Sequence, residues 1–123
     1  MTPYFADSFF WFALANPGDG SHARATQYAQ ASAPLVTTAW VITELADGLC
    51  KAARRAAFLR LHDLMTLDPF LTIVPADQSL MGRGLALYAS RPDKDWSLTD
   101  CISFVVMEEH KLTEALTGDH HFE

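Results

Sequence analysis

Four acidic residues from distant parts of the chain stand where a parallel α/β sheet would gather them. Asp7 ends the first apolar run, and Asp119 follows the last one. Glu44 and Asp100 each lie near the start of a predicted helix. The carboxyl ends of parallel strands open on one side of a sheet, and carboxylates meeting there repel one another unless a cation neutralises them. Because hard oxygen ligands suit Mg²⁺ or Mn²⁺, the pattern predicts a divalent-metal site, the alternative being solvated acids and helix caps.

Short apolar runs alternate with longer helical patterns along the whole chain. The predicted strands cover residues 3–6, 34–38, 70–74 and 115–117. Predicted helices cover residues 8–14, 22–31, 54–67 and 98–110, and two more follow the second and third strands. Of these two, one runs through Val41, Leu45 and Leu49, and the other is capped by Asp77. The helix over 54–67 has an apolar stripe: Phe58, Leu61, Leu64 and Met65. Such alternation indicates βαβ units and a parallel sheet covered on both faces. We therefore expect one three-layer α/β/α domain over residues 1–123, without repeats or a linker.

Composition and charge exclude several classes of protein. Half of the residues are hydrophobic and a fifth are charged, as in a globular domain with a core. The net charge of −6 argues against a protein that coats nucleic acid non-specifically, but not against a nuclease with a local metal site. No apolar run is long enough to span a membrane, and the N-terminus lacks a secretion leader. Cys50 and Cys101 fall in predicted helices, so we expect free buried thiols in a reducing cytoplasm.

The residues around the four acids resemble those of PIN-domain ribonucleases, in particular the VapC-type toxins of toxin–antitoxin systems. The segments that carry the resemblance are Phe5-Ala6-Asp7-Ser8, Ile42-Thr43-Glu44-Leu45, Trp96-Ser97-Leu98-Thr99-Asp100-Cys101 and Leu116-Thr117-Gly118-Asp119-His120-His121-Phe122. They occur in the family's order and span essentially the whole chain. The third and fourth segments are the most specific.

The resemblance implies a metal-dependent endoribonuclease that uses Mg²⁺ or Mn²⁺ to hydrolyse RNA phosphodiester bonds. It implies one acidic catalytic quartet: Asp7, Glu44, Asp100 and Asp119. Three of these would contact metal, namely Asp7, Asp100 and Asp119. Glu44 would orient the attacking water or complete the shell of a second ion, with Ser8 and Thr117 as polar helpers. Family members continue into a final short strand, so we expect that strand to be missing from a sequence that stops at Glu123.

The resemblance also implies partners, namely an antitoxin protein and a second copy of the chain in a homodimer. VapC-like proteins bind an antitoxin segment near the first helix, where Phe9-Phe10-Trp11-Phe12 is apolar on every side. That run predicts either a docking groove or a helix covered on both sides. The alternative function is a PIN-like module that binds RNA or protein without cleaving. A phosphoacceptor receiver domain would need a second acid beside Asp7, and none is evident.

Several other residues have a functional and a structural interpretation. Asp93 and Asp95 precede the third motif and are either solvated or close to the pocket, and the same holds for Asp47, one helical turn after Glu44. His120 and His121 lack the second histidine pair that a zinc site needs. Cys101 has no activating histidine nearby and is expected to be a core thiol. The basic residues, expected on two adjoining helices, form either a solvated face or a rim that steers RNA: Lys51, Arg54, Arg55 and Arg60.

Overall fold

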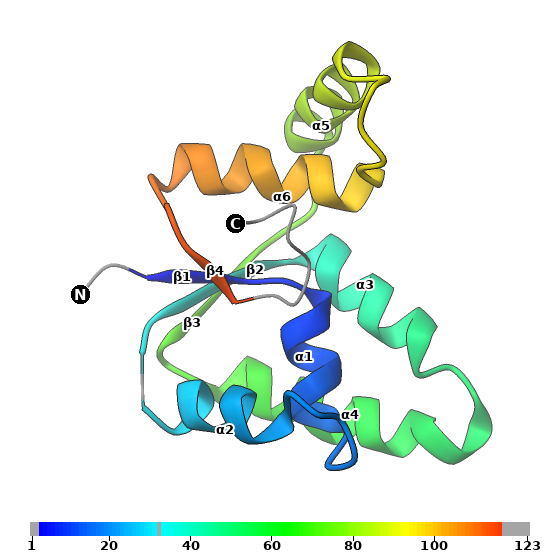
Figure 1. The fold of residues 1–123 in the computed structure, drawn as a ribbon, viewed down its shortest axis with the longest axis vertical. Coiled ribbons are helices and arrows are strands. Elements are labelled where there is room, and N and C mark those ends of the chain that lie inside the picture. The colour runs from blue at the N-terminus through cyan, green and yellow to red at the C-terminus, as the bar shows by residue number, and fades with distance from the viewer. Residues whose placement is uncertain (1–2, 32, 117–123) are drawn as a thin grey trace.

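The computed structural model describes residues 3–31 and 33–116, which form a parallel sheet with helices on both faces (Figure 1). In chain order the elements are β1 (Tyr4–Ala6), α1 (Ser8–Ala15), α2 (His22–Gln30), β2 (Leu35–Thr38), α3 (Ala39–Gly48), α4 (Ala52–Leu67), β3 (Leu71–Val74), α5 (Gln78–Ser90), α6 (Leu98–Glu109) and β4 (Ala115–Leu116). Each strand is followed by helical chain before the next strand, as predicted. Within the described ranges, no helix is long and apolar enough to cross a membrane.

The four strands are all parallel and lie in the order β3-β2-β1-β4. The chain moves outwards from β1 to β2 and β3, and then crosses back so that β4 pairs with the other side of β1. In the register between β1 and β4, Phe5 lies opposite Ala115 and Ala6 opposite Leu116. The direction of winding therefore reverses between β1 and β4, which is where parallel sheets of this kind bind ligands.

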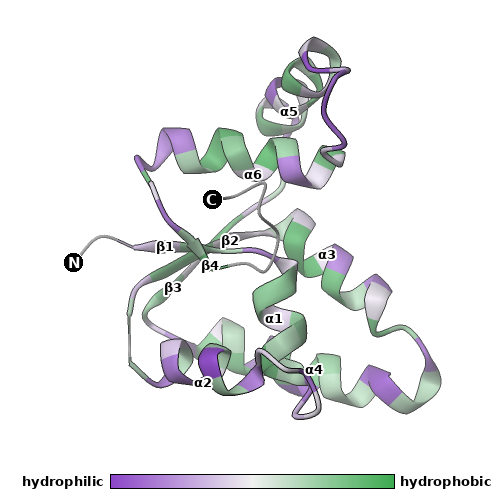
Figure 2. Cartoon of the chain, in the orientation of Figure 1, coloured by the Kyte–Doolittle hydropathy of each residue, from purple (hydrophilic) through white to green (hydrophobic). Residues whose placement is uncertain are grey.

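Helices cover the sheet on both sides, which confirms the three-layer α/β/α class. In Figure 1, α5 and α6 lie on one side of the sheet, and α1, α2 and α4 lie on the other. Hydrophobic residues are concentrated on α1, on the strands and in the middle of α6, whereas the α5–α6 connection is hydrophilic (Figure 2). The core is built from fully buried side chains such as Phe5, Leu45, Ile102 and Val106. The sheet is thus enclosed on both faces and is accessible only along its edges.

Side-chain caps set the starts of the helices at the edge where the strands end. Asp7 accepts a hydrogen bond from the Phe10 amide at 3.3 Å and begins α1. Thr38 Oγ1 accepts from the Val41 amide at 3.1 Å and begins α3. Such caps satisfy amides that have no partner within the helix, so each strand can turn into a helix within one residue.

Three sequence predictions about exposure or placement are wrong. Leu64 is 67% exposed, because α4 rests on the fold along the narrower stripe of Leu61 and Met65. Cys50 is exposed and lies between α3 and α4, whereas Cys101 is free and buried as expected. The basic residues do not span two helices: Lys51 is the N-cap of α4, and Arg54, Arg55 and Arg60 all lie on α4.

Candidate active site

The candidate site lies at the carboxyl edge of the sheet, beside the end of β1. Asp7 follows the last residue of β1 and is only 7% exposed. Its main-chain carbonyl accepts from the Trp11 amide, and its carboxylate caps α1 through the Phe10 amide. The first turn of α1 thus holds Asp7 at the point where the winding of the sheet reverses. Because helix N-termini carry partial positive charge, a carboxylate is stabilised there.

The carbonyl of Ala6, immediately before Asp7, is held by side chains rather than by a neighbouring strand. Thr37 Oγ1 donates a hydrogen bond to the Ala6 oxygen at 2.8 Å, and Trp11 Nε1 donates to the same oxygen at 3.2 Å. Trp11 Nε1 also lies 3.4 Å from Thr37 Oγ1. All three residues are buried. The pairing of β1 with β2 ends at Phe5 and Val36, so these side chains hold the chain in place where the two strands separate.

The second acid of the predicted quartet lies next to the first turn of α1. Glu44 is the sixth residue of the ten-residue helix α3, so it lies in the middle of the helix and not near its start as predicted, and its side chain is half-buried. Ser8 Oγ donates a hydrogen bond to Glu44 Oε1 across 36 positions of sequence. This contact places Glu44 beside the residue that follows Asp7.

The third acid sits at the start of α6 and points back along the chain. Asp100 Oδ2 accepts from the Ser97 amide at 3.0 Å, and Ser97 Oγ accepts from the Asp100 amide at 3.0 Å. This reciprocal pair is a capping box, which fixes both the helix start and the carboxylate. Asp100 therefore takes part in a helix cap in this structure, which is the role that the alternative interpretation gave it.

The fourth predicted acid, Asp119, lies outside the described residues, as do Thr117, His120 and His121. Among residues 3–31 and 33–116, no group of three or more His, Cys, Asp or Glu side chains is close enough to hold a metal ion. The donor chemistry is nevertheless that of a magnesium or manganese site, since Asp7, Glu44 and Asp100 all offer carboxylate oxygens. In the register between β1 and β4, Leu116, the last residue that the structure describes, lies opposite Ala6, which directly precedes Asp7.

The remaining candidate acids do not join this group in the described structure. Asp47 is exposed on α3. Asp93 is held by Arg91, whose Nε and Nη2 donate to its carboxylate oxygens at 3.0 and 2.9 Å. These hydrogen bonds lower the pKa of Asp93 to about 2. Asp95 is exposed in the α5–α6 connection and lines a hollow with Trp96.

The aromatic run of α1 is covered more fully than a docking groove would be. Phe10 and Trp11 are each 4% exposed, and their rings meet edge to face. Phe12 is half-buried and lies against Gly48 of α3. Phe9 is exposed to 41% and presents an aromatic surface to solvent. The covered-helix interpretation therefore holds for Phe10 and Trp11, whereas Phe9 stays exposed to solvent.

Sequence reasoning missed two features beside the acids. Thr37 was predicted only as part of a strand, and Trp11 only as part of an aromatic run. Nothing in the sequence showed that their side chains would meet at the Ala6 carbonyl. Trp96 was noted only as part of a motif, although its ring lies within 6 Å of two cationic groups, at 5.3 Å from Arg91 Cζ and 5.8 Å from Lys94 Nζ. The available signal was a tryptophan in a polar loop, with Arg91 and Lys94 five and two residues before it.

Comparison with known proteins identifies the relatives of this chain. The profile of the PIN domain family matches residues 4–123. The 23S rRNA-specific endonuclease VapC20, from two strains of Mycobacterium tuberculosis, is 28% identical over 125 residues, which is 96% of this chain and 90% of the relative. The crystal structure of Mycobacterium tuberculosis VapC20, described as a toxin that cleaves the sarcin–ricin loop, superposes with a TM-score of 0.86 at 23% identity. That match covers 97% of this chain and 92% of the other.

Proposed function

This chain belongs to the PIN domain family, and on that premise we propose that it is a VapC-type endoribonuclease, a toxin that hydrolyses RNA phosphodiester bonds. One observation carries the proposal: the hydrogen bond from Ser8 to Glu44 brings an acid of α3 beside Asp7, at the ligand-binding edge of the sheet. The similarity to a 23S rRNA-specific endonuclease over 96% of the chain supports RNA as the substrate.

We assign catalysis to a quartet of Asp7, Glu44, Asp100 and Asp119. Asp7 is held by its own helix and by the bonds to the Ala6 carbonyl, so its carboxylate has little freedom to move. Glu44 carries a bond from Ser8 to one carboxylate oxygen, which orients the other for a water molecule. Asp100 is fixed by its capping box at the start of α6, which covers the other face of the sheet from α1 (Figure 1). Acids from three helices thus act on one phosphodiester, and preorganisation of this kind lowers the barrier to hydrolysis.

We propose Mg²⁺ or Mn²⁺ as the cofactor, held by Asp7, Asp100 and Asp119. When bound, the ion supplies a water of lowered pKa and neutralises charge on the phosphate. Asp7 is suited to this task, because a buried carboxylate at a helix start needs a cation when further acids approach it. The protein's own part is to hold the acids in position and to leave the carboxyl edge of the sheet open to RNA.

The proposed partners are an antitoxin and a second copy of this chain, and the proposed location is the cytoplasm. VapC-type toxins are held inactive by an antitoxin, and Phe9 offers this chain an exposed aromatic contact for it. Because Phe9 is exposed to solvent, Phe9→Asp should weaken antitoxin binding while the protein stays folded. Titration calorimetry against the antitoxin measures the effect, with Asp47→Asn on the exposed face of α3 as a control. Equal affinity of the Phe9→Asp variant and the control would exclude Phe9 from the interface.

The competing function is a PIN-like module that binds RNA or protein without cleaving it. A cleavage assay separates the two, using total RNA and purified ribosomes with Mg²⁺, Mn²⁺ or EDTA. We expect cleavage by the wild-type protein in Mg²⁺ or Mn²⁺, none in EDTA, and a loss of roughly 10²- to 10⁴-fold in Asp7→Asn. Mg²⁺ should also raise the melting temperature of the wild type more than that of Asp7→Asn. RNA that stays intact in every metal would leave the binding module as the function.

A further inference from the structure

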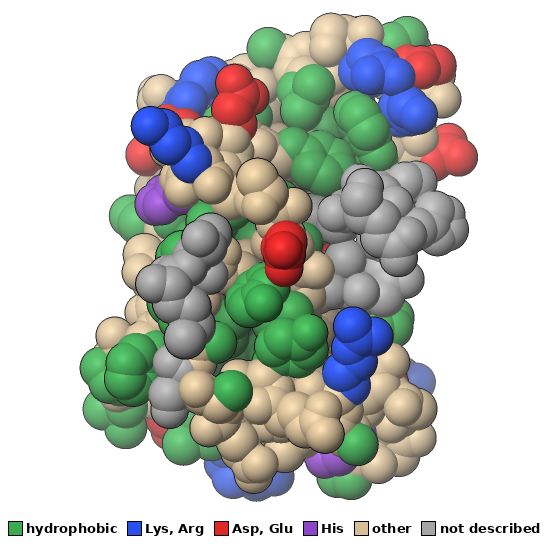
Figure 3. Space-filling view, turned by 60° about the vertical axis from the view of Figure 1, so that its left-hand side comes forward, with side chains coloured by type: hydrophobic (Ala, Val, Ile, Leu, Met, Phe, Trp, Pro, Cys, Tyr) green, Lys and Arg blue, Asp and Glu red, His purple; other side chains and the backbone are tan. Residues whose placement is uncertain are grey.

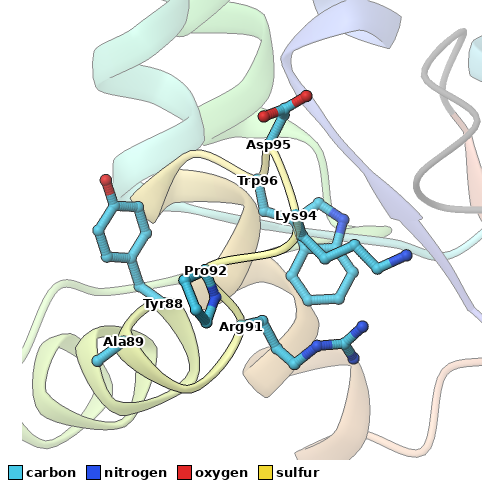
Figure 4. Close-up of a pocket in the computed structure, with 7 residues that line it drawn as sticks. All are labelled: Tyr88, Ala89, Arg91, Pro92, Lys94, Asp95 and Trp96. Atoms are coloured by element: carbon cyan, nitrogen blue, oxygen red, sulfur yellow. The ribbon is translucent and has the colours of Figure 1, made fainter.

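A hollow opens beside the start of α6, between the last turn of α5 and the α5–α6 connection (Figure 4). Its volume is about 560 Å³, and it is lined by Tyr88, Pro92 and Trp96 together with three charged residues. Tyr88 is 52% exposed, and the Trp96 ring is half-buried. Trp96 packs edge to face against Phe104 of α6, with the ring centroids 4.9 Å apart. The hollow thus has two aromatic side chains in contact with solvent, of which Trp96 is held by its packing on Phe104.

Positive charge is concentrated at one side of this hollow. Lys94 and Arg91 extend past the Trp96 ring in the same direction, while the Asp95 carboxylate points away from them (Figure 4). Arg91 is paired with Asp93, so its charge is already balanced. Lys94 has no ion pair within the described ranges, because the salt bridges there join Arg83 to Glu109 and Arg91 to Asp93. An unpaired ammonium beside an aromatic wall is suited to a ligand that combines an anion with a planar ring.

The hollow adjoins the candidate active site. Trp96 directly precedes Ser97, whose amide donates to the Asp100 carboxylate at 3.0 Å. The basic residues of α4 are further away, since the ten-residue helix α3, about 15 Å long, leads from the carboxyl end of β2 to the start of α4 (Figure 1). On the face shown in Figure 3, acidic and basic side chains are interspersed, and no single basic surface dominates. Lys94, two residues before Trp96, is therefore a cation in position to meet RNA that reaches Asp100.

We propose that this hollow is a nucleotide subsite for single-stranded RNA next to the cleaved bond. An unpaired base packs in the hollow against Tyr88, Pro92 or Trp96, and the Lys94 ammonium contacts an adjoining phosphate. The site reads the flat face of a base, so it favours unpaired RNA over duplex. The inference rests on the proposed ribonuclease function and adds to it the part of the molecule that holds the substrate.

Binding of a fluorescein-labelled single-stranded oligoribonucleotide, followed by anisotropy, tests the proposal. All proteins carry Asp7→Asn so that the RNA stays intact. We expect Lys94→Gln to weaken binding roughly three- to tenfold and to lower the slope of log K against log salt by about one. The matched control is Arg60→Gln, which removes the same charge from the exposed face of α4 and should stay within about twofold of the parent.

The base contact is tested with Tyr88→Ala, which changes an exposed side chain and leaves the core intact. We expect Tyr88→Ala to weaken binding of the normal oligomer about fivefold or more, and to leave binding of an abasic oligomer unchanged. Lys94→Gln should weaken both oligomers. If Lys94→Gln and Tyr88→Ala both bind as Arg60→Gln does while the wild type still cleaves RNA, the subsite is wrong and the ribonuclease function stands. If the parent binds no RNA and the wild type cleaves none, both are wrong.

Discussion

Replacing Thr37 with valine should lower the rate of RNA cleavage more than it lowers the stability of the fold, because the Thr37 hydroxyl helps to position Asp7. Thr37 is fully buried, and its hydroxyl donates to the Ala6 carbonyl at 2.8 Å. Thr37→Val keeps the shape of the side chain, and Trp11 Nε1 still donates to the Ala6 oxygen at 3.2 Å, so no buried polar group loses its last partner. The loss is then the bond to Ala6, about 1 kcal/mol of unfolding free energy, together with the longer 3.4 Å bond from Trp11 Nε1, which keeps Ala6 as its acceptor. For a domain of this size, that lowers the melting temperature by about 3–5 °C.

The effect on activity should be larger than this loss of stability implies. The Ala6 carbonyl is joined directly to Asp7, and displacing a catalytic group by about 1 Å costs up to about 10²-fold in rate. Because Trp11 still holds the carbonyl, we expect Thr37→Val to lower kcat for RNA cleavage about tenfold with KM little changed.

The assay compares single-turnover cleavage with urea unfolding for Thr37→Val, Thr37→Ser and the wild type. Thr37→Ser keeps the hydroxyl and should restore most of the activity, although it removes a buried methyl group. If Thr37→Val cleaves RNA as fast as the wild type well below its melting temperature, the bond to Ala6 does not position Asp7. If Thr37→Val lost more than about 3 kcal/mol of unfolding free energy, the substitution would disturb more than the hydrogen bonds of the Thr37 hydroxyl.

Packing and thiol exposure give two further predictions. A Cβ added at Gly84 of α5 would meet Ile102 Cγ1 and lie 3.4 Å from the Ile102 Cα, so Gly84→Ala should destabilise the fold by about 1–3 kcal/mol. A Cβ at Gly82 on the same helix meets nothing within 4 Å, so Gly82→Ala should stabilise the fold by about 0.5–1 kcal/mol, as measured by urea unfolding. If both variants changed the free energy of unfolding in the same direction, the packing of α5 on α6 would be contradicted. Ellman's reagent should modify the exposed Cys50 at once and Cys101 only after unfolding, because burial raises the pKa of the Cys101 thiol and blocks access; two fast thiols would refute this.

The alternation of apolar runs and helical patterns was enough to predict a parallel sheet covered on both faces. Buried parallel strands must be apolar on both sides, and the helices between them must carry one apolar stripe, so both signals are local. The cap Asp77 was also predicted, since a short polar side chain at a helix start bonds a free amide, whereas Asp7 was predicted as a metal ligand and is seen as the cap of α1. The order of motifs along the chain gave the PIN family, which the match over residues 4–123 confirms.

The end of α6 shows where local signals were insufficient. Lys111 adopts a φ of 56°, a left-handed conformation that usually requires glycine, and the Leu112 amide closes the helix by donating to the Met107 carbonyl at 2.8 Å. A lysine gives no such signal in sequence. Its conformation is imposed because Leu112 must be buried while β4 returns to pair with β1.

The sequence by itself determined which residue types were available for chemistry: the acids Asp7, Glu44 and Asp100, the hydroxyl of Ser8 next to Asp7, and Trp96 two residues after Lys94. Only the tertiary structure decided which of them meet. Ser8 reaches Glu44, and Thr37 reaches the Ala6 carbonyl, because separate βα units bring them to one edge of the sheet. Contacts between residues 31 to 36 positions apart depend on the registers and helix tilts of the whole domain. These are fixed by the packing of all the elements together, and no local pattern of residues encodes them.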